Sequence, residues 1–248
     1  MKTLVVLPTY NESATIAEVL RRIRATGLHG VHVLVVDDNS PDGTADLVEA
    51  ISGELGDIEV LRRPSKAGLG SAYREGFKAG LRQNYEVLVE MDADLSHDPS
   101  VLGDLLAEID HGADIVIGTR YMPGGSIPGW SWYRRAISRF GNLYARWMLG
   151  LPARDATSGY RAYHRRALEH INLTAVRADG YGFQIEMAYK VLRAGGILAE
   201  VPIEFHDRTF GRSKMSSRIV AEALVLVTWW GISGRVRERR KARALAGA

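Results

Sequence analysis

The sequence contains no cysteine, which excludes disulfide bonds, zinc–thiolate sites and a cysteine nucleophile. It has no apolar run as long as the roughly 20 residues that a membrane-spanning helix needs, and its first residues lack the pattern of a secretory signal peptide. A net charge of +3 is too small to indicate nucleic acid as a partner. What is present is a globular composition, with 46% hydrophobic and 25% charged residues in a chain of 248. We therefore expect a large folded domain that is soluble or peripheral to a membrane.

Hydrophobic periodicity predicts alternating strands and helices in the first half of the chain. Apolar, β-branched runs predict strands at residues 3–7, 31–36, 58–61, 85–91 and 114–118. Apolar residues at helical spacing predict helices at residues 13–24, 44–51, 71–81 and 98–110. This alternation indicates the α/β class, with a mostly parallel sheet flanked by helices. A dinucleotide-binding oxidoreductase is disfavoured, because the first strand ends in Pro8-Thr9-Tyr10-Asn11-Glu12 and not in a Gly-x-Gly-x-x-Gly turn.

The most informative stretch is Asp92-Ala93-Asp94-Leu95-Ser96-His97, which follows the predicted strand 85–91. Open α/β sheets bind ligands at the carboxyl ends of their strands, and this strand delivers two carboxylates there. Oxygen ligands of this kind suit Mg²⁺ or Mn²⁺, which commonly also hold substrate phosphates. The alternative is a polar turn in front of a helix capped by Asp98 or Ser100. We assign His97 to the turn.

Two further strand ends carry polar clusters, Tyr10 with Glu12 and Asp37 with Asp38. A carboxylate such as Asp37 can accept hydrogen bonds from a nucleobase or from ribose hydroxyls. Each cluster taken alone is also compatible with helix capping. Gly68 and Gly70 follow the third strand and predict either a tight turn approaching a nucleotide or the sheet, or a plain loop.

These motifs together resemble glycosyltransferase family 2 and, within it, the catalytic subunits of the polyprenol-phosphate (dolichyl-phosphate) mannosyltransferases. The resemblance covers residues 2–217 and is carried by Pro-Thr-Tyr-Asn-Glu, Asp-Asp-Asn-Ser-Pro-Asp-Gly-Thr, Lys-Ala-Gly-Leu-Gly, Asp-Ala-Asp-Leu-Ser-His and Gly-Thr-Arg-Tyr. It implies a GT-A fold, GDP-mannose as donor, a polyprenyl monophosphate as acceptor, and inversion at the sugar carbon.

The resemblance also implies roles for individual residues. The donor nucleotide sugar would contact Pro8, Tyr10, Glu12, Val35, Asp37, Asp92, Ala93, Asp94, Arg120, Arg208 and Lys214. The metal, Mg²⁺ or Mn²⁺, would be held by Asp94, Asp92 and Ser96. Asp94, Arg120, Arg208 and Lys214 would be the catalytic residues. Arg208 and Lys214 flank a glycine turn, and the family's Arg-x-x-Gly-x-Ser-Lys pattern is intact there. Their positive charges suit the binding of phosphates by a mobile loop. The alternative is a solvated basic loop.

Residues 127–149 are unusually aromatic and basic. Arg134 and Ser138 are four residues apart and share one helical face, where a guanidinium can match phosphate oxygens. In the family these positions bind the acceptor phosphate. The alternative is an amphipathic helix that only solvates its basic face. The segments Asp155–Arg161 and Gly182–Met187 resemble family motifs near the donor sugar, although Gln184 and Glu186 are equally compatible with a polar pair in the core.

The last 31 residues, 218–248, are expected to form an amphipathic helix and a basic tail behind the catalytic domain of residues 1–217. Residues 219–234 are apolar, include a tryptophan pair, and precede several arginines, a pattern typical of a helix lying in the interface of an anionic membrane. A packed helix with a loose end is the alternative. We expect a peripheral protein at the cytoplasmic face of a membrane, with a possible membrane partner protein.

An acceptor phosphate removes the need for a general base, because its second pKa is near 6 and it is already ionised at neutral pH. The resemblance, taken with this chemistry, implies a metal-dependent inverting mannosyltransferase that positions two anionic substrates. Two alternatives are a polyprenyl-phosphate transferase for glucose or another sugar, and a non-catalytic nucleotide-sugar-binding protein docked on a membrane.

Overall fold

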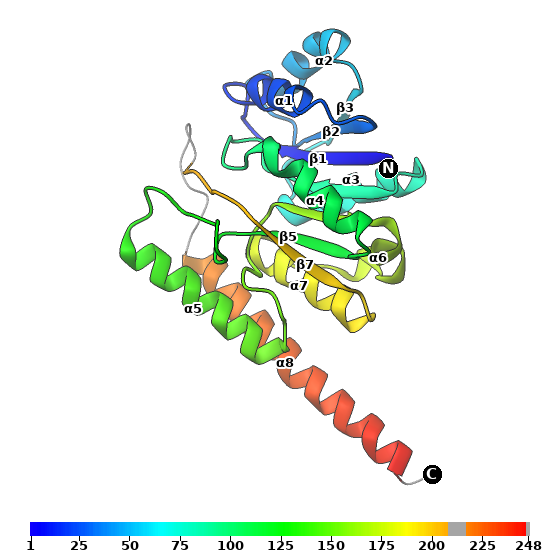
Figure 1. The fold of residues 1–248 in the computed structure, drawn as a ribbon, viewed down its shortest axis with the longest axis vertical. Helices are drawn as coiled ribbons and strands as arrows, with labels where there is room; N and C mark the ends of the chain where they lie inside the picture. Colours follow the sequence, from blue (N-terminus) through cyan, green and yellow to red (C-terminus); the bar gives the residue numbers. More distant parts are fainter. Residues whose placement is uncertain (208–216, 247–248) are drawn as a thin grey trace.

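The computed structural model describes residues 1–207 and 217–246, and in the last helix it describes the side chains of residues 220–234. A seven-stranded sheet in the order β3-β2-β1-β4-β6-β5-β7 forms its centre (Figure 1). The strands are β1 (Thr3–Thr9), β2 (Val31–Asp37), β3 (Ile58–Arg62), β4 (Val87–Glu90), β5 (Ile115–Thr119), β6 (Arg161–His164) and β7 (Leu198–Pro202). All neighbours are parallel except that β6 runs antiparallel to β4 and β5. The predicted α/β class with a mostly parallel sheet is confirmed.

The helices surround this sheet (Figure 1). They are α1 (Ile16–Ala25), α2 (Thr44–Leu55), α3 (Leu69–Arg82), α4 (Leu102–Asp110), α5 (Trp132–Leu149), α6 (Arg165–His170), α7 (Gly180–Arg193) and α8 (Ser217–Ala246), with 3₁₀ turns η1 (Pro99–Val101) and η2 (Leu173–Ala175). The five strands predicted in the first half of the chain occur within two residues of their expected bounds. The helix expected from residue 98 begins with η1, where the Asp98 carboxylate accepts a hydrogen bond from the Ser100 N–H at 2.9 Å.

Both faces of the sheet are covered, which explains why β1, β2, β4 and β5 are nearly continuous apolar runs. Side chains alternate along β1, so Val5 and Leu7 pack in one cluster with residues of α1, α2 and α4. Leu4 and Val6 pack on the opposite face with residues of α3, α6 and α7. Helix α3 lies especially close to the sheet, because a Cβ placed on Gly80 would be 2.6 Å from Leu88 Cδ2. The sheet is thus rigidly held between two helical layers.

Helices α5 and α8 form an additional layer that packs on α7 and not on the sheet (Figure 1). Ala145 of α5, Ile185 of α7 and Val227 of α8 are buried in the cluster between them. Helix α5 ends at Gly150, whose φ of +67° lies in the left-handed region that glycine favours. Among the described helices, none is both long and apolar enough to cross a membrane. The division of the chain at residue 217 coincides with the start of α8 and stays a prediction.

Candidate active site

A cavity of about 650 Å³ lies at the carboxyl ends of β1 and β4. These strands are neighbours, and β1 pairs with β2 on its other side, so the strand order reverses here. Such a switch point is where open α/β sheets bind ligands. Eight of the predicted site residues line this cavity: Pro8, Tyr10, Glu12, Asp92, Ala93, Asp94, Arg120 and Arg134. The fold therefore brings most of the predicted site residues in the described part of the chain to one cavity, and their roles there stay a prediction.

The other predicted site residues in the described part of the chain are placed elsewhere. Val35 is fully buried in the core, and Asp37 is only 1% exposed. The Asp37 carboxylate accepts hydrogen bonds from Thr9 Oγ1 at 2.8 Å and from Ser40 Oγ at 2.6 Å. Its neighbour Asp38 lines the cavity instead. Direct contacts of Val35 and Asp37 with a nucleotide stay a prediction that this arrangement does not support.

Asp92 and Asp94 are presented by a sharply reversed turn. Asp94 is buried, and its Oδ1 accepts the Ser96 N–H at 3.0 Å. Leu95, between them, has a φ of +65°, a conformation that costs a leucine about 1–2 kcal/mol. Asn11 and Asn39, which follow β1 and β2, are also left-handed, but asparagine tolerates this conformation. Strain in a leucine at a strand end indicates that the surrounding contacts impose the shape of this turn.

His97 contributes to that shape. Its Nδ1 accepts a hydrogen bond from the Asp92 N–H at 3.1 Å, and its ring stacks on Tyr160 with the ring centroids 5.0 Å apart. The edge of the Phe205 ring approaches it from another side, at 5.6 Å between centroids. This placement agrees with the assignment of His97 to the turn.

The donor set fits a hard divalent cation only in part. Asp92 and Asp94 both line the cavity, and Mg²⁺ is commonly bound through one or two carboxylates plus substrate phosphates and water. Within the described residues no group of three or more histidine, aspartate or glutamate side chains is arranged around a metal position. Ser96 Oγ is buried, has no hydrogen-bond partner in the described part of the chain and is not at the cavity wall. The two aspartates are thus suited to a metal, whereas the role of Ser96 stays a prediction.

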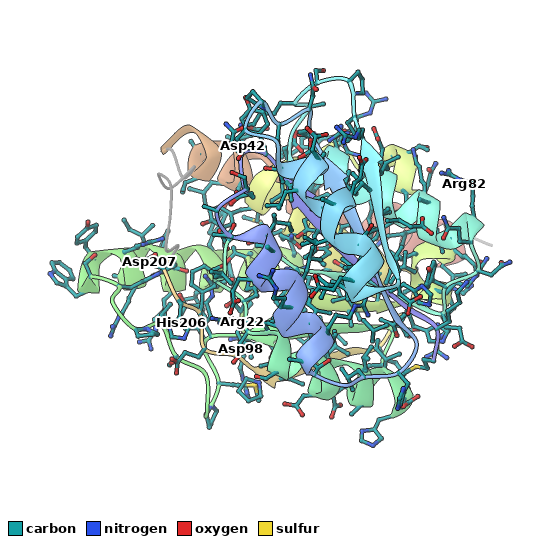
Figure 2. The ribbon with its side chains drawn as sticks, turned by 90° about the horizontal axis from the view of Figure 1, so that it is seen from above. Arg22, Asp42, Arg82, Asp98, His206 and Asp207 are labelled. Carbon is teal, nitrogen blue, oxygen red and sulfur yellow. The ribbon has the colours of Figure 1, made fainter. Side chains whose placement is uncertain are left out.

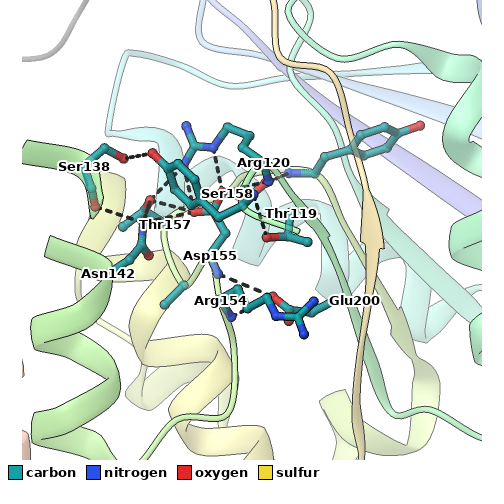
Figure 3. Close-up of polar contacts among 12 residues, drawn as sticks. Thr119, Arg120, Ser138, Asn142, Arg154, Asp155, Thr157, Ser158 and Glu200 are labelled. Atoms are coloured by element: carbon teal, nitrogen blue, oxygen red, sulfur yellow. Dashed lines mark hydrogen bonds and ion pairs between the residues drawn. The ribbon is translucent and has the colours of Figure 1, made fainter. Parts of the chain in front are cut away.

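Arg120 directly follows β5, lines the same cavity as the two aspartates, and is fixed by Asp155 (Figure 3). Its Nε donates to Asp155 Oδ2 at 2.6 Å and its Nη2 to Asp155 Oδ1 at 2.7 Å. Thr157 Oγ1 accepts from the same Nη2 at 2.9 Å, and Asn142 Nδ2 donates to Asp155 Oδ1 at 3.3 Å. Burial opposes both charges, but their attraction outweighs it, so the pKa of Asp155 is lowered and that of Arg120 is raised. A permanent positive charge is therefore held at this wall of the cavity.

Arg134 lies on the first turn of α5 at the same cavity. Its guanidinium carbon is 3.9 Å from the centroid of the Trp130 ring, and its Nη1 donates to both carboxylate oxygens of Asp207, at 2.8 and 3.0 Å. Ser138, one turn further along α5, accepts a hydrogen bond from the Tyr121 hydroxyl at 2.7 Å. Arg134 and Ser138 both line a second, apolar cavity of about 70 Å³ between α5 and α8. The two acceptor candidates thus lie together where the two cavities adjoin.

The large cavity is also lined by Lys66 and Asp38. Lys66 Nζ lies 4.0 Å from the centroid of the Tyr10 ring, and Arg63 forms an ion pair with Asp38. Burial raises the pKa of Asp38, although the positive charge of Arg63 opposes this shift. Lys66 belongs to the Lys-Ala-Gly-Leu-Gly motif, but neither it nor Arg63 was predicted as a site residue.

Gly68 and Gly70 lie close to Asp179, the residue that precedes α7. The Gly70 N–H donates to Asp179 Oδ1 at 2.9 Å. A Cβ placed on Gly68 would be 2.5 Å from Asp179 Oδ2, and the φ of Gly68 is +93°. The positive φ and the short distance to Asp179 both require glycine at residue 68. These contacts hold the start of α3 beside the start of α7, and both line the cavity. Asp179 and Tyr181 were not predicted, because nothing in the local pattern distinguishes them.

Arg208 and Lys214 lie outside the described residues. Their assignment to the donor phosphates stays a prediction.

Comparison with known proteins gives the family. The family model of glycosyl transferase family 2 matches residues 4–171. The chain belongs to glycosyl transferase family 2. A polyprenol monophosphomannose synthase of Mycolicibacterium smegmatis is 47% identical over 240 residues, which span 96% of this chain and 90% of that protein. An undecaprenyl-phosphate mannosyltransferase of Micrococcus luteus is 48% identical over 235 residues, which span 95% of this chain and 96% of that protein.

The fold of this family 2 glycosyltransferase also matches solved structures. A glucosyl-3-phosphoglycerate synthase from Mycobacterium tuberculosis, in complex with Mn²⁺, UDP-glucose and glycerol 3-phosphate, superposes with a TM-score of 0.66. The match covers 91% of this chain and 78% of the other at 21% identity, so it bears on the fold alone. The expected GT-A fold, a mostly parallel sheet flanked by helices, is confirmed.

Proposed function

We propose that the protein transfers mannose from GDP-mannose to the phosphate of a polyprenyl monophosphate, with inversion at the sugar carbon and with Mg²⁺ or Mn²⁺ as cofactor. One observation carries this proposal. A single cavity is lined both by two carboxylates, Asp92 and Asp94, and by two guanidinium groups, Arg120 and Arg134. Carboxylates that can bind a cation and guanidinium groups that can bind phosphate suit a cavity in which two anionic substrates must meet. The names of the two bacterial relatives support the lipid phosphate and the mannosyl group.

The nucleoside diphosphate fits the end of the cavity that carries Tyr10, Glu12 and Asp38. Tyr10 offers an aromatic face, and carboxylates can accept from base N–H groups and ribose hydroxyls. A bound Mg²⁺ or Mn²⁺ would neutralise charge on the departing diphosphate, held by Asp92 and Asp94. Arg120 adds a fixed positive charge, because Asp155 holds its guanidinium in place.

The acceptor phosphate is already ionised, so an oxygen of it attacks the anomeric carbon without a general base. A new bond forms from that oxygen to the carbon, while the bond from the carbon to the donor diphosphate breaks and GDP leaves with the electron pair. Arg134 is suited to hold the acceptor phosphate, since a guanidinium matches phosphate oxygens with parallel hydrogen bonds. Ser138 offers a hydroxyl on the same helical face.

The smaller cavity supports an acceptor with an apolar chain. It adjoins the large cavity at Trp130, Arg134 and Tyr181, which line both. From there it runs between α5 and α8 along apolar side chains that include Ile185, Leu224 and Val227. A phosphate at Arg134 would therefore have a hydrocarbon-compatible path leading away from it.

Exposed side chains of α5 and α8 support binding at a membrane surface. The large hydrophobic residues exposed on these two helices are Trp132, Tyr133, Ile137, Phe140, Leu143, Trp147, Val225, Trp229 and Ile232. Trp132 is 81% exposed. Apolar and aromatic side chains with interspersed arginines are typical of helices that lie in a membrane interface. We propose a peripheral protein at the cytoplasmic face of a membrane, with anionic lipids as its partners.

Label transfer tests this function. The full chain is incubated with Mn²⁺ or Mg²⁺, farnesyl phosphate, and either labelled GDP-mannose or labelled UDP-glucose, and the lipid product is extracted. We expect labelled mannosyl lipid, a β anomeric configuration by NMR, and a loss of transfer by orders of magnitude in Asp94→Asn. If only labelled UDP-glucose gives a labelled lipid, the protein transfers glucose and the proposed mannose donor is wrong. Binding of GDP-mannose without any transfer would leave a nucleotide-sugar-binding protein in place of an enzyme.

A further inference from the structure

Arg134 is paired with a carboxylate at the position where the proposed function puts the acceptor phosphate. Its Nη1 contacts both oxygens of Asp207, and both residues line the large cavity. Asp207 comes from the segment after β7, 73 residues away in the chain, and lies beside α5 (Figure 2). Trp130 covers the face of the guanidinium, and Asp207 accepts hydrogen bonds from Nη1 on its edge. An acceptor phosphate that binds to this nitrogen would therefore meet an internal anion.

The Arg134–Asp207 ion pair is one that a phosphate can replace. The side chains of Arg134 and Asp207 are 25% and 50% exposed, respectively. Exposed arginine–aspartate pairs contribute little to stability, so such a contact opens readily. A phosphate monoester carries more negative charge than a carboxylate and presents three strong acceptor oxygens. It is therefore the stronger ligand for the same guanidinium.

We propose that Asp207 is a positioning residue that holds Arg134 ready and is displaced by the acceptor phosphate. The inference rests on the proposed function, because it takes Arg134 as the acceptor ligand. In the empty site Asp207 compensates the Arg134 charge and keeps the guanidinium beside Trp130. When the phosphate binds, it exchanges one anion for another, and no new positive charge has to be brought into the cavity.

If Asp207 competes with the acceptor for Arg134, only the molecules in which the pair is open can bind the acceptor. The apparent dissociation constant for the acceptor then equals the intrinsic one divided by the fraction of open molecules. Exposed ion pairs favour the closed form by a factor of about one to five. Removing the Asp207 charge should therefore lower the KM for the acceptor about two- to six-fold. The KM for GDP-mannose should stay unchanged, because Asp207 accepts its hydrogen bonds from Arg134, which the proposed function assigns to the acceptor.

The test uses the full chain with Mn²⁺ and farnesyl phosphate as acceptor, and compares the wild type with Asp207→Asn. Glu204→Gln is the matched control, an exposed acid of the same segment whose carboxylate contacts Ser126 and His206. We expect the farnesyl phosphate KM to fall two- to six-fold in Asp207→Asn and to stay constant in Glu204→Gln. Calorimetric titration with farnesyl phosphate should give the same ratio of dissociation constants.

A double-variant cycle identifies the route of the effect. In the Arg134→Gln background, Asp207→Asn should leave the farnesyl phosphate KM unchanged, because the competing contact no longer exists. An unchanged or raised KM in Asp207→Asn, with transfer by the wild type intact, would overturn this inference and leave the proposed function standing. If the wild type neither binds farnesyl phosphate nor transfers to it, both are overturned.

Discussion

Replacing Asp155 with asparagine should be among the most destabilising single changes available near this cavity. Asp155 is fully buried, and it is the carboxylate that compensates Arg120, which is only 6% exposed. The side chain volume hardly changes, but Arg120 is left with two neutral acceptors, the amide oxygen of the new side chain and the Thr157 hydroxyl, and with no negative charge. Removing one partner of a buried ion pair costs about 3–5 kcal/mol. For a chain of this size, that corresponds to a fall in Tm of about 6–20 °C.

The matched control is Asp46→Asn, which also removes an aspartate from an arginine. Asp46 pairs with Arg62, but its side chain is 75% exposed, so the expected change is at most about 1 kcal/mol. Urea denaturation at pH 7 measures both variants, with the slope against urea showing that the extent of unfolding is unchanged. An Asp155→Asn variant that is folded and within 1 kcal/mol of the wild type would refute the account of a buried, compensated charge.

The pH dependence provides an independent check on the same pair. The pKa of Asp155 is lowered in the folded protein, so its stabilising contribution is complete above the ordinary aspartate pKa of about 3.9. That contribution is lost as the pH falls through the lowered pKa. The difference in unfolding free energy between the wild type and Asp155→Asn should therefore be constant from pH 5 to 8 and shrink below about pH 4.

Three further predictions follow from burial and exposure. Burial raises the pKa of Glu90 to about 7, so the stability linked to its proton is complete below about pH 4.5 and is lost as the pH rises to 7. Between pH 5 and pH 8, urea unfolding should show the wild type losing up to about 3 kcal/mol of stability relative to Glu90→Gln. Parallel pH profiles of the two proteins would contradict this. Gly80→Ala should lower the unfolding free energy of the protein by about 1–3 kcal/mol, because the added Cβ would overpack α3 against the sheet. The control Gly53→Ala, in α2 with nothing within 4 Å of the added Cβ, should raise it by about 0.5–1 kcal/mol. Equal Tm values for the two variants would contradict the close packing of α3. Trp132→Glu and Trp147→Glu should each weaken co-sedimentation with anionic vesicles while leaving Tm unchanged, and undiminished sedimentation would exclude α5 as the membrane-facing helix.

The first five strands could be predicted because each contains a run of apolar residues. Four of them, β1, β2, β4 and β5, are mainly buried between two helical layers, which requires that composition. Strand β6 could not be predicted in the same way. Its four residues, Arg161–His164, include arginine, tyrosine and histidine, which do not form an apolar run. It is a strand because it pairs antiparallel with both β4 and β5, which lie far from it in the chain. Arg161 is accommodated there by donating to the carbonyl oxygens of Ala156, Ser158 and Gln184.

The cavity shows the same division between local and distant information. Carboxylates at strand ends are visible in the sequence, and the parallel sheet brings Tyr10, Asp92 and Asp94 to one edge. The choice between Asp37 and Asp38 depends on where β2 ends, since successive side chains point in opposite directions. The pairing of Arg120 with Asp155 joins residues 35 positions apart, and no periodicity connects them.

The two sides of the cavity are built from interactions of different strength, and this difference suits the two proposed substrates. The donor side is formed by strand ends, a strained turn at Leu95 and a buried ion pair at Arg120, so its groups are fixed before a ligand arrives. The acceptor side depends on Arg134, whose pair with Asp207 is exposed, and on two helices that pack away from the sheet. Regions with exposed contacts and few sheet neighbours open at lower free energy than the core. A small nucleotide sugar can enter a rigid pocket, whereas a long lipid needs a wall that yields, and the rearrangement is confined to the helices that face the membrane in our proposal.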